Sequence, residues 1–167
     1  MTETKTYIPE LLPRRGEITA WALAVVALFG LYFLSLRQDV PFWAWFFVAF
    51  LTFSAGSISL GNWMDRRTFI RIEPAGVVFE NGLRKPQLAW EAIQNVRSAP
   101  SRWGFSVQVI GSQSHFSFST LGEMKFQGQV RGRTGFVEGD AIFNEIIRCA
   151  GLTKKVQTGQ LLTYSRP

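Results

Sequence analysis

Arginine and glycine alternate in the stretch QGQVRGRTG, residues 127–135, which is the part of the sequence best suited to hold an anion. Arg131 and Arg133 supply two guanidinium groups, and such groups form paired hydrogen bonds with phosphate or carboxylate oxygens. The glycines between them would let the backbone approach the same anion closely. A solvated turn before a helix is the simpler interpretation of these residues. We therefore treat Arg131 and Arg133 as interaction candidates.

A second pair of cations, Arg84 and Lys85, lies in NGLRKP, residues 81–86. Asn, Gly and Pro in this stretch predict a turn. We take both residues as further interaction candidates, after Arg131 and Arg133. RNA is not expected as a ligand, since no exposed aromatic platform accompanies the arginines. We expect no nucleic-acid partner.

The residue types that commonly carry catalysis are few and scattered. The only histidine, His115, falls on the expected polar face of a strand, and the only cysteine, Cys149, falls in an expected helix, where packing is its simplest role. Zinc needs three or four ligands, which one histidine and one distant cysteine do not supply. No two carboxylates stand out as a general acid and base, and the sequence has no phosphate-binding loop or dinucleotide fingerprint. We expect a non-catalytic protein without cofactor or metal.

Two long apolar segments precede these residues in the sequence and have the length and composition of membrane-spanning helices. Residues 18–36 and 42–60 contain no Asp, Glu, Lys or Arg, and only RQDVP separates them. Each would span about 28 Å as a helix, close to the hydrocarbon thickness of a bilayer. A cleaved signal peptide would have a shorter apolar core and no second segment of equal length. The sequence predicts a transmembrane helical hairpin over residues 18–61.

Basic residues indicate the orientation of this hairpin. Arg14 and Arg15 precede it, and Arg66 and Arg67 follow it. Because Lys and Arg resist translocation, we expect both termini on the cytoplasmic side, in a bacterial inner membrane or a thylakoid. Residues 65–167 carry an excess of Lys and Arg over Asp and Glu equal to the whole net charge of +6. Such a basic domain is favoured beside an anionic leaflet.

Small residues recur four positions apart near the end of the second apolar segment. Ala55 is spaced in this way with Ser59, and Ser57 with Gly61. This spacing lets two helices approach closely. The partner helix is either the first apolar segment or a helix of another protein.

After residue 67 the hydrophobic period changes from helical to strand-like. Apolar and polar residues alternate most clearly in FSVQVI and HFSFS, which predicts an antiparallel sheet with one dry face. From Asp140 the pattern becomes that of an amphipathic helix, with Asp140 as the expected N-cap and Gly151 as the residue that follows its end. We expect six or seven strands followed by this helix.

The stretch FIRIEPAGVVFENGLRKPQLAWEAIQNV resembles the opening half of the bacterial PH-like (pleckstrin-homology-like) domains found next to membrane spans. In that family a strand, a turn ending in glycine and a second strand lead to a W-x-x-I step, here Gly76 followed by Trp90 to Ile93. The resemblance implies a bent antiparallel sheet of about seven strands closed by a C-terminal helix. Phosphoinositide-binding members use basic residues around the first strand-to-strand loop, whereas here that loop is the acidic EPAG. The layout is also similar to that of photosystem I assembly factors.

These features divide the chain into an N-terminal tail (1–17), the hairpin (18–61), a PH-like domain (66–152) and a C-terminal tail (153–167). The tails are poor folders alone and are expected to order on a partner. We expect a non-catalytic interaction, assembly or stabilising subunit of a larger membrane protein complex, in contact with the bilayer. The alternative is a PH-like domain that binds anionic lipid headgroups or a small ligand at the membrane surface.

Overall fold

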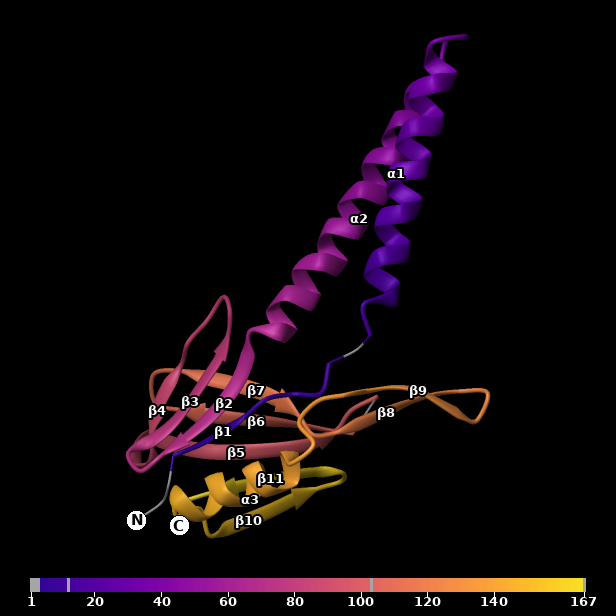
Figure 1. The fold of residues 1–167 in the computed structure, drawn as a ribbon. Helices are drawn as coiled ribbons and strands as arrows, with labels where there is room; N and C mark the ends of the chain where they lie inside the picture. The colour runs from indigo at the N-terminus through magenta and orange to yellow at the C-terminus, as the bar shows by residue number, and fades with distance from the viewer. Residues whose placement is uncertain (1–3, 12, 103, 167) are drawn as a thin grey trace. The chain divides into compact units, whose positions relative to one another are not determined.

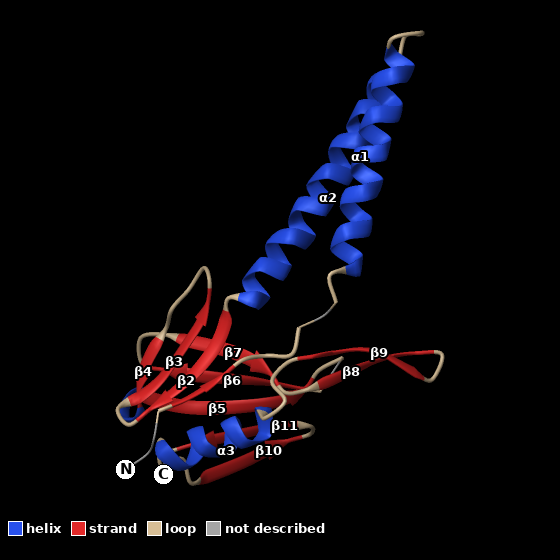
Figure 2. Cartoon of the chain, viewed as in Figure 1, coloured by secondary structure: helices blue, strands red, loops and turns tan. Residues whose placement is uncertain are grey.

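The computed structural model describes residues 4–11, 13–102 and 104–166, and the chain divides into two units. One unit is a helical hairpin, residues 13–64, and the other is a β-rich unit formed by residues 1–12 and 65–167. Figure 1 follows the chain through both units, and Figure 2 shows that strands dominate the second.

The helical unit consists of α1 (Arg15–Ser35) and α2 (Phe42–Arg66). Both helices are long and apolar enough to cross a membrane, as the sequence predicted. Most of their large apolar side chains are exposed, while the small Ala24 of α1 and Ala55 of α2 are buried. The helices therefore pack through these alanines together with Val48, which is also buried, and leave most of their bulky side chains exposed.

The described residues of the β-rich unit form three antiparallel sheets. The first has the strand order β1-β2-β3-β4, and its strands are Lys5–Tyr7, Thr68–Glu73, Gly76–Asn81 and Gln87–Ala89. Pro74 and Ala75 turn the chain between β2 and β3, where the sequence predicted a turn. A single 3-10 turn, η1 (Trp90–Ala92), then leads into the second sheet. The indole Nε1 of Trp90 donates a hydrogen bond to the Pro74 carbonyl at 3.0 Å, which fastens this turn to the β2–β3 turn.

The second sheet has the strand order β10-β11-β5-β6-β7. Its strands, in chain order from β5, are Ile93–Pro100, Phe105–Gly111, His115–Ser119, Lys154–Thr158 and Leu161–Ser165. Phe116 and Phe118 of β7 point into the core and His115 is exposed, as their alternation predicted. Among the described residues the two larger sheets are not joined into a closed barrel, since each has two edge strands.

The third sheet is the hairpin of β8 (Gly122–Phe126) and β9 (Gln129–Thr134), which extends away from the other strands in Figure 1. Its two-residue turn has positive φ at both positions, 50° at Gln127 and 80° at Gly128. These values define a type I′ turn, which matches the twist of paired strands. The stretch 127–135 that we expected to be a loop is therefore mostly a strand.

Helix α3 (Gly139–Cys149) buries Ile142 and Ile146 completely in the core. Its N-cap is Glu138 rather than the expected Asp140, and Glu138 makes no side-chain capping bond. The helix begins earlier because the Ile142 N–H donates the first helical hydrogen bond to the Glu138 carbonyl at 2.9 Å, while Gly139 packs against Thr120, where a Cβ on residue 139 would overlap Thr120 Cα. The C-terminal prediction is confirmed: Gly151 has a φ of 64° and its N–H donates to the Arg148 carbonyl.

One hydrophobic core joins α3 to both larger sheets. Its fully buried large side chains are Ile70, Ile72, Val77, Ile93, Val96, Val107, Val109, Ile142 and Ile146. These residues come from the strands β2, β3, β5 and β6 and from the helix. The core thus lies between the sheets and one apolar helix face, in the part of the chain where hydrophobic alternation was clearest.

Two segments that we expected to be tails are strands of these sheets. Strand β1 pairs with β2, with Tyr7 opposite Ile70, and β11 pairs with β5 while β10 completes a hairpin with it. Strand β10 is exposed along its whole length, so it contributes backbone hydrogen bonds rather than buried side chains. The β-rich unit therefore includes residues on both sides of the hairpin and extends to the end of the described chain.

Candidate anion-binding site

The loop between β3 and β4 is held in one conformation by Asn81. The Asn81 Oδ1 accepts hydrogen bonds from the backbone N–H groups of Leu83 (3.3 Å) and Arg84 (2.9 Å). The Asn81 N–H donates in turn to the Arg84 carbonyl at 3.1 Å. Asparagine favours such turns because its short side chain can bond the backbone two or three residues on. The exposed Arg84 and Lys85 are therefore presented by an ordered turn.

Arg84 and Lys85 line a hollow of about 430 Å³ with residues of the β6–β7 turn. The lining residues are Arg84, Lys85, Pro86, Gln113, Ser114 and His115. The β6–β7 turn is itself fixed, because the Gly111 N–H donates to the Ser114 carbonyl at 2.9 Å. The fold thus brings the histidine beside the two cations, although some thirty residues separate them in sequence.

Several residues that line the hollow carry hydrogen-bond donors. They combine a guanidinium, an ammonium, an imidazole, an amide and a hydroxyl group, and donors of this kind bind the oxygens of phosphate or carboxylate groups. The Lys85 ammonium also lies 3.2 Å from the Glu80 carboxylate, which offsets part of its charge. Arg84 is therefore the principal cation of this site.

Of the two candidate arginines in residues 127–135, Arg133 is the one whose side chain the structure describes, and it forms an ion pair. It lies on β9 directly opposite Glu123 of β8, and their side chains approach to 3.3 Å. The pairing of the strands shifts by one residue at Arg131, whose side chain lies outside the described part of the structure. The hairpin therefore holds the Arg133 side chain against a carboxylate.

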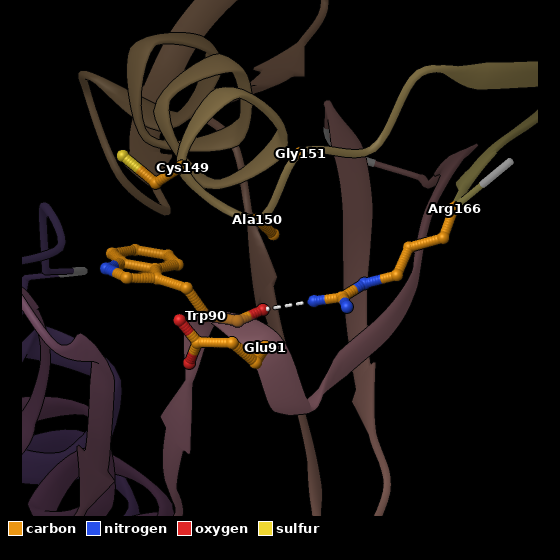
Figure 3. Close-up of a pocket in the computed structure, with 6 residues that line it drawn as sticks. All are labelled: Trp90, Glu91, Cys149, Ala150, Gly151 and Arg166. Carbon is orange, nitrogen blue, oxygen red and sulfur yellow. Dashed lines mark hydrogen bonds between the residues drawn. The ribbon is translucent and has the colours of Figure 1, made fainter.

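A second hollow, of about 520 Å³, lies where the C-terminal strand returns to η1 (Figure 3). The Arg166 guanidinium donates a hydrogen bond to the Trp90 carbonyl at 2.9 Å across this hollow, and Cys149 lies near the indole ring. Cys149 packs against the core, in agreement with the role expected from the sequence. The contact ties the end of β11 to the step between the two larger sheets.

A third hollow, of about 400 Å³, lies where the chain leaves β1 and enters α3. The Tyr7 hydroxyl donates to Glu145 Oε2 at 3.3 Å. Burial raises the pKa of Tyr7 above its usual value of 10.0, and the negative charge of Glu145 adds to this effect. On the rim, the side chains of Ile8 and Val137 are 68% and 62% exposed.

The helical unit contains a polar contact that sequence reasoning missed. Glu17 of α1 accepts hydrogen bonds from Ser59 Oγ and Asn62 Nδ2 of α2, both at 2.9 Å, and Trp21 Nε1 donates to Ser59 Oγ at 2.8 Å. Glu17 and Asn62 lie just outside the uncharged stretches that we considered. In an antiparallel helical hairpin these two positions fall at the same end, and this placement could have predicted the contact.

The small residues of α2 divide between two faces. Ala55 is fully buried and Ser59 bonds α1, so this pair faces the other helix of the hairpin. Ser57 and Gly61 are exposed, and the Ser57 hydroxyl donates to the Phe53 carbonyl of its own helix. The two pairs proposed for helix packing therefore occupy different environments.

In the described ranges no group of three or more His, Cys, Asp or Glu side chains is placed to hold a metal ion. Comparison with family models, with curated proteins and with solved structures found no match to this chain. Function must therefore be inferred from the residues and geometry of the chain itself.

Proposed function

We propose that this chain is a membrane-anchored, non-catalytic accessory protein that docks on other subunits of a larger membrane complex. The α1–α2 hairpin would lie in the bilayer with both termini on the cytoplasmic side. The β-rich unit would be a PH-like docking domain at that surface. Its strands β2 to β7, arranged in two antiparallel sheets and followed by an amphipathic helix in the same core, support this assignment.

The pairing of β1 with β2 supports the placement of both termini on one side. These strands flank the hairpin in sequence and are hydrogen-bonded neighbours. Since backbone pairing cannot extend across a bilayer, a chain in which both helices span the membrane must return to the side from which it started. The arginines at both ends of the hairpin favour the cytoplasm as that side.

The observation that carries the docking proposal is the hollow between β1 and α3. Its rim residues Ile8 and Val137 are largely exposed although they come from segments far apart in sequence. A partner that covered them would gain roughly 25 cal/mol for each Å² of apolar surface removed from water. The nearby β8–β9 hairpin, a separate two-stranded sheet, offers strand edges that could pair with an added strand.

The test is affinity capture of the full chain after mild detergent solubilisation, followed by quantitative mass spectrometry. We expect stoichiometric membrane proteins with the wild-type chain and at least a tenfold loss with Ile8→Asp combined with Val137→Asp. The matched control is Val156→Asp combined with Leu161→Asp, which changes two exposed apolar residues of the β10–β11 hairpin. Equal recovery with both double variants would contradict this docking surface.

Binding of anionic headgroups is a second candidate function, and the hollow that Arg84, Lys85 and His115 help to line favours it. The two functions use different residues, so one protein can have both. Flotation of the full chain in vesicles cannot separate them, because the hairpin alone would hold it there. A test must therefore report on the β3–β4 loop directly.

A further inference from the structure

Leu83 lies in the β3–β4 loop and is 62% exposed. Arg84 and Lys85 follow it directly, and the Asn81 side chain fixes the turn that presents all three. At a membrane surface, an apolar side chain enters the boundary between headgroups and acyl chains, while neighbouring cations reach lipid phosphates. A turn that is already ordered loses little conformational entropy when it docks.

The register of the first sheet brings this loop to the end at which the chain arrives from α2. Thr68, the first residue of β2, is paired with Asn81, the last residue of β3. Only Arg67 separates α2 from β2. Two Cα steps of about 3.8 Å and one strand pairing of about 5 Å limit the distance between the Arg66 and Asn81 Cα atoms to about 13 Å.

The length of α2 places this junction at the level of the headgroups when the helix crosses a bilayer. Its 25 residues extend about 38 Å, whereas the hydrocarbon core is about 30 Å thick. The helix ends in a polar stretch that contains Asn62, Asp65 and Arg66. A loop that begins within about 13 Å of Arg66 is thus tethered close to lipid phosphates.

The charges around the loop favour an anionic leaflet. Glu80 is the carboxylate paired with Lys85, and the Arg71–Glu73 pair, separated by 3.8 Å, contributes no net charge. Arg84 and Arg67 add positive charge on an exposed surface, and His115 adds a donor. Each Lys or Arg close to an anionic surface adds to the attraction, which salt screens over about one Debye length.

We propose that residues 82–85 form a second membrane contact, in which Leu83 enters the interface of an anionic leaflet while Arg84 and Lys85 bind lipid phosphates. This inference rests on the proposed location of α1 and α2 in the bilayer. It goes beyond that location, because an anchor alone does not specify which face of the β-rich unit meets the membrane. The loop contact would fix one orientation and thereby decide which faces of the unit a partner can reach.

The experiment uses the full chain in vesicles with Cys149→Ser as background. Leu83→Cys carries an environment-sensitive fluorophore, and Val156→Cys, on the fully exposed strand β10, is the control. With phosphatidylglycerol in the vesicles we expect blue-shifted emission at residue 83, quenched at least threefold more by spin-labelled lipids than at residue 156. Arg84→Gln combined with Lys85→Gln, or phosphatidylcholine alone, should abolish that difference.

A second measurement keeps Leu83 and avoids the fluorophore. Amide hydrogen exchange at residues 82–85 of the wild-type chain should slow at least tenfold in phosphatidylglycerol vesicles relative to phosphatidylcholine vesicles. Leu83→Asp should remove that protection, while Val156→Asp should preserve it. Protection that is equal in both lipids, or unaffected by Leu83→Asp, would overturn the lipid contact.

Failure of the inference is distinguishable from failure of the proposed function. If the chain resists alkaline extraction from the vesicles but the fluorophore at residue 83 emits as it does in water, the loop contact is overturned and the anchor remains. A chain that alkaline buffer extracts overturns both. Protection that occurs in native membranes but not in pure lipid assigns the loop to a protein partner and overturns the lipid contact.

Discussion

Ser59 in α2 donates a hydrogen bond to the Glu17 carboxylate of α1 across 2.9 Å, and this contact joins the two helices of the hairpin at their polar end. Asn62, one turn further along α2, bonds the second carboxylate oxygen. A carboxylate with both oxygens engaged by one neighbouring helix fixes the register between the helices in a way that apolar contacts do not.

Glu17→Ala should therefore weaken the association of α1 with α2. Interhelical hydrogen bonds in membrane proteins contribute about 0.6 kcal/mol on average, so the loss of two should cost about 1–2 kcal/mol. Thermal unfolding of the full chain in mild detergent would measure this cost. Ser57→Ala is the matched control, because the Ser57 hydroxyl bonds its own helix, and it should change stability by less than about 0.5 kcal/mol.

Gly135→Ala should destabilise the β-rich unit strongly. Gly135 has a φ of 98°, and a Cβ on it would overlap the Thr120 carbonyl oxygen. A left-handed backbone and a steric clash together should cost about 3 kcal/mol or more. The control is Gly128→Ala, with a similar φ of 80° but no atom within 4 Å of the added Cβ. It should cost only about 1–2 kcal/mol, and equal losses in the two variants would contradict the close approach at Thr120.

The contact between Tyr7 and Glu145 should make the stability of the β-rich unit fall at alkaline pH. The pKa of Tyr7 is raised in the folded chain, so the unfolded chain loses the hydroxyl proton first as pH rises above 10. The stabilisation is complete below pH 10 and is lost as pH passes through the folded-state pKa. Tyr7→Phe should remove this component. Absorbance titration of phenolate in wild type minus Tyr7→Phe would measure the pKa, and a value at or below 10 would contradict the burial.

The ion pair between Arg133 and Glu123 should matter little for stability. Both side chains are partly exposed, at 51% and 37%, and exposed pairs contribute about 0–1 kcal/mol. Arg133→Ala should therefore change the unfolding free energy by less than about 1 kcal/mol. A double-mutant cycle with Glu123→Ala measures the pair alone. A coupling above about 2 kcal/mol would show that the hairpin depends on this pair for its position.

Hydrophobic patterns predicted the elements that bury apolar side chains. The two apolar segments, the alternation around Phe116 and Phe118, and the face of α3 that carries Ile142 and Ile146 all have periods that match their structures. Strands β1 and β10 escaped prediction because they bury little and gain their place through hydrogen bonds to other strands. The expected N-cap at Asp140 was wrong because the first helical hydrogen bond, from the Ile142 N–H, goes to the carbonyl of Glu138.

The candidate site was predicted in part. Arg84 and Lys85 were assigned to a turn because Asn81 and Pro86 frame it, and local sequence determines turns of this kind. The addition of His115 depends on how the second sheet packs beside the first, which local sequence does not encode. The stretch that contains Arg131 and Arg133 was expected to be a loop. It is a strand because Gln127 and Gly128 form a tight turn at its start.

The pairing of β1 with β2 also bears on the order of events during synthesis. The ribosome completes β1 first, then both apolar helices, and only then the strand that β1 must join. Until translation has passed the second helix, the N-terminal segment has no template for its backbone amides. The first sheet therefore reaches its full strand order only after the second helix has been synthesised.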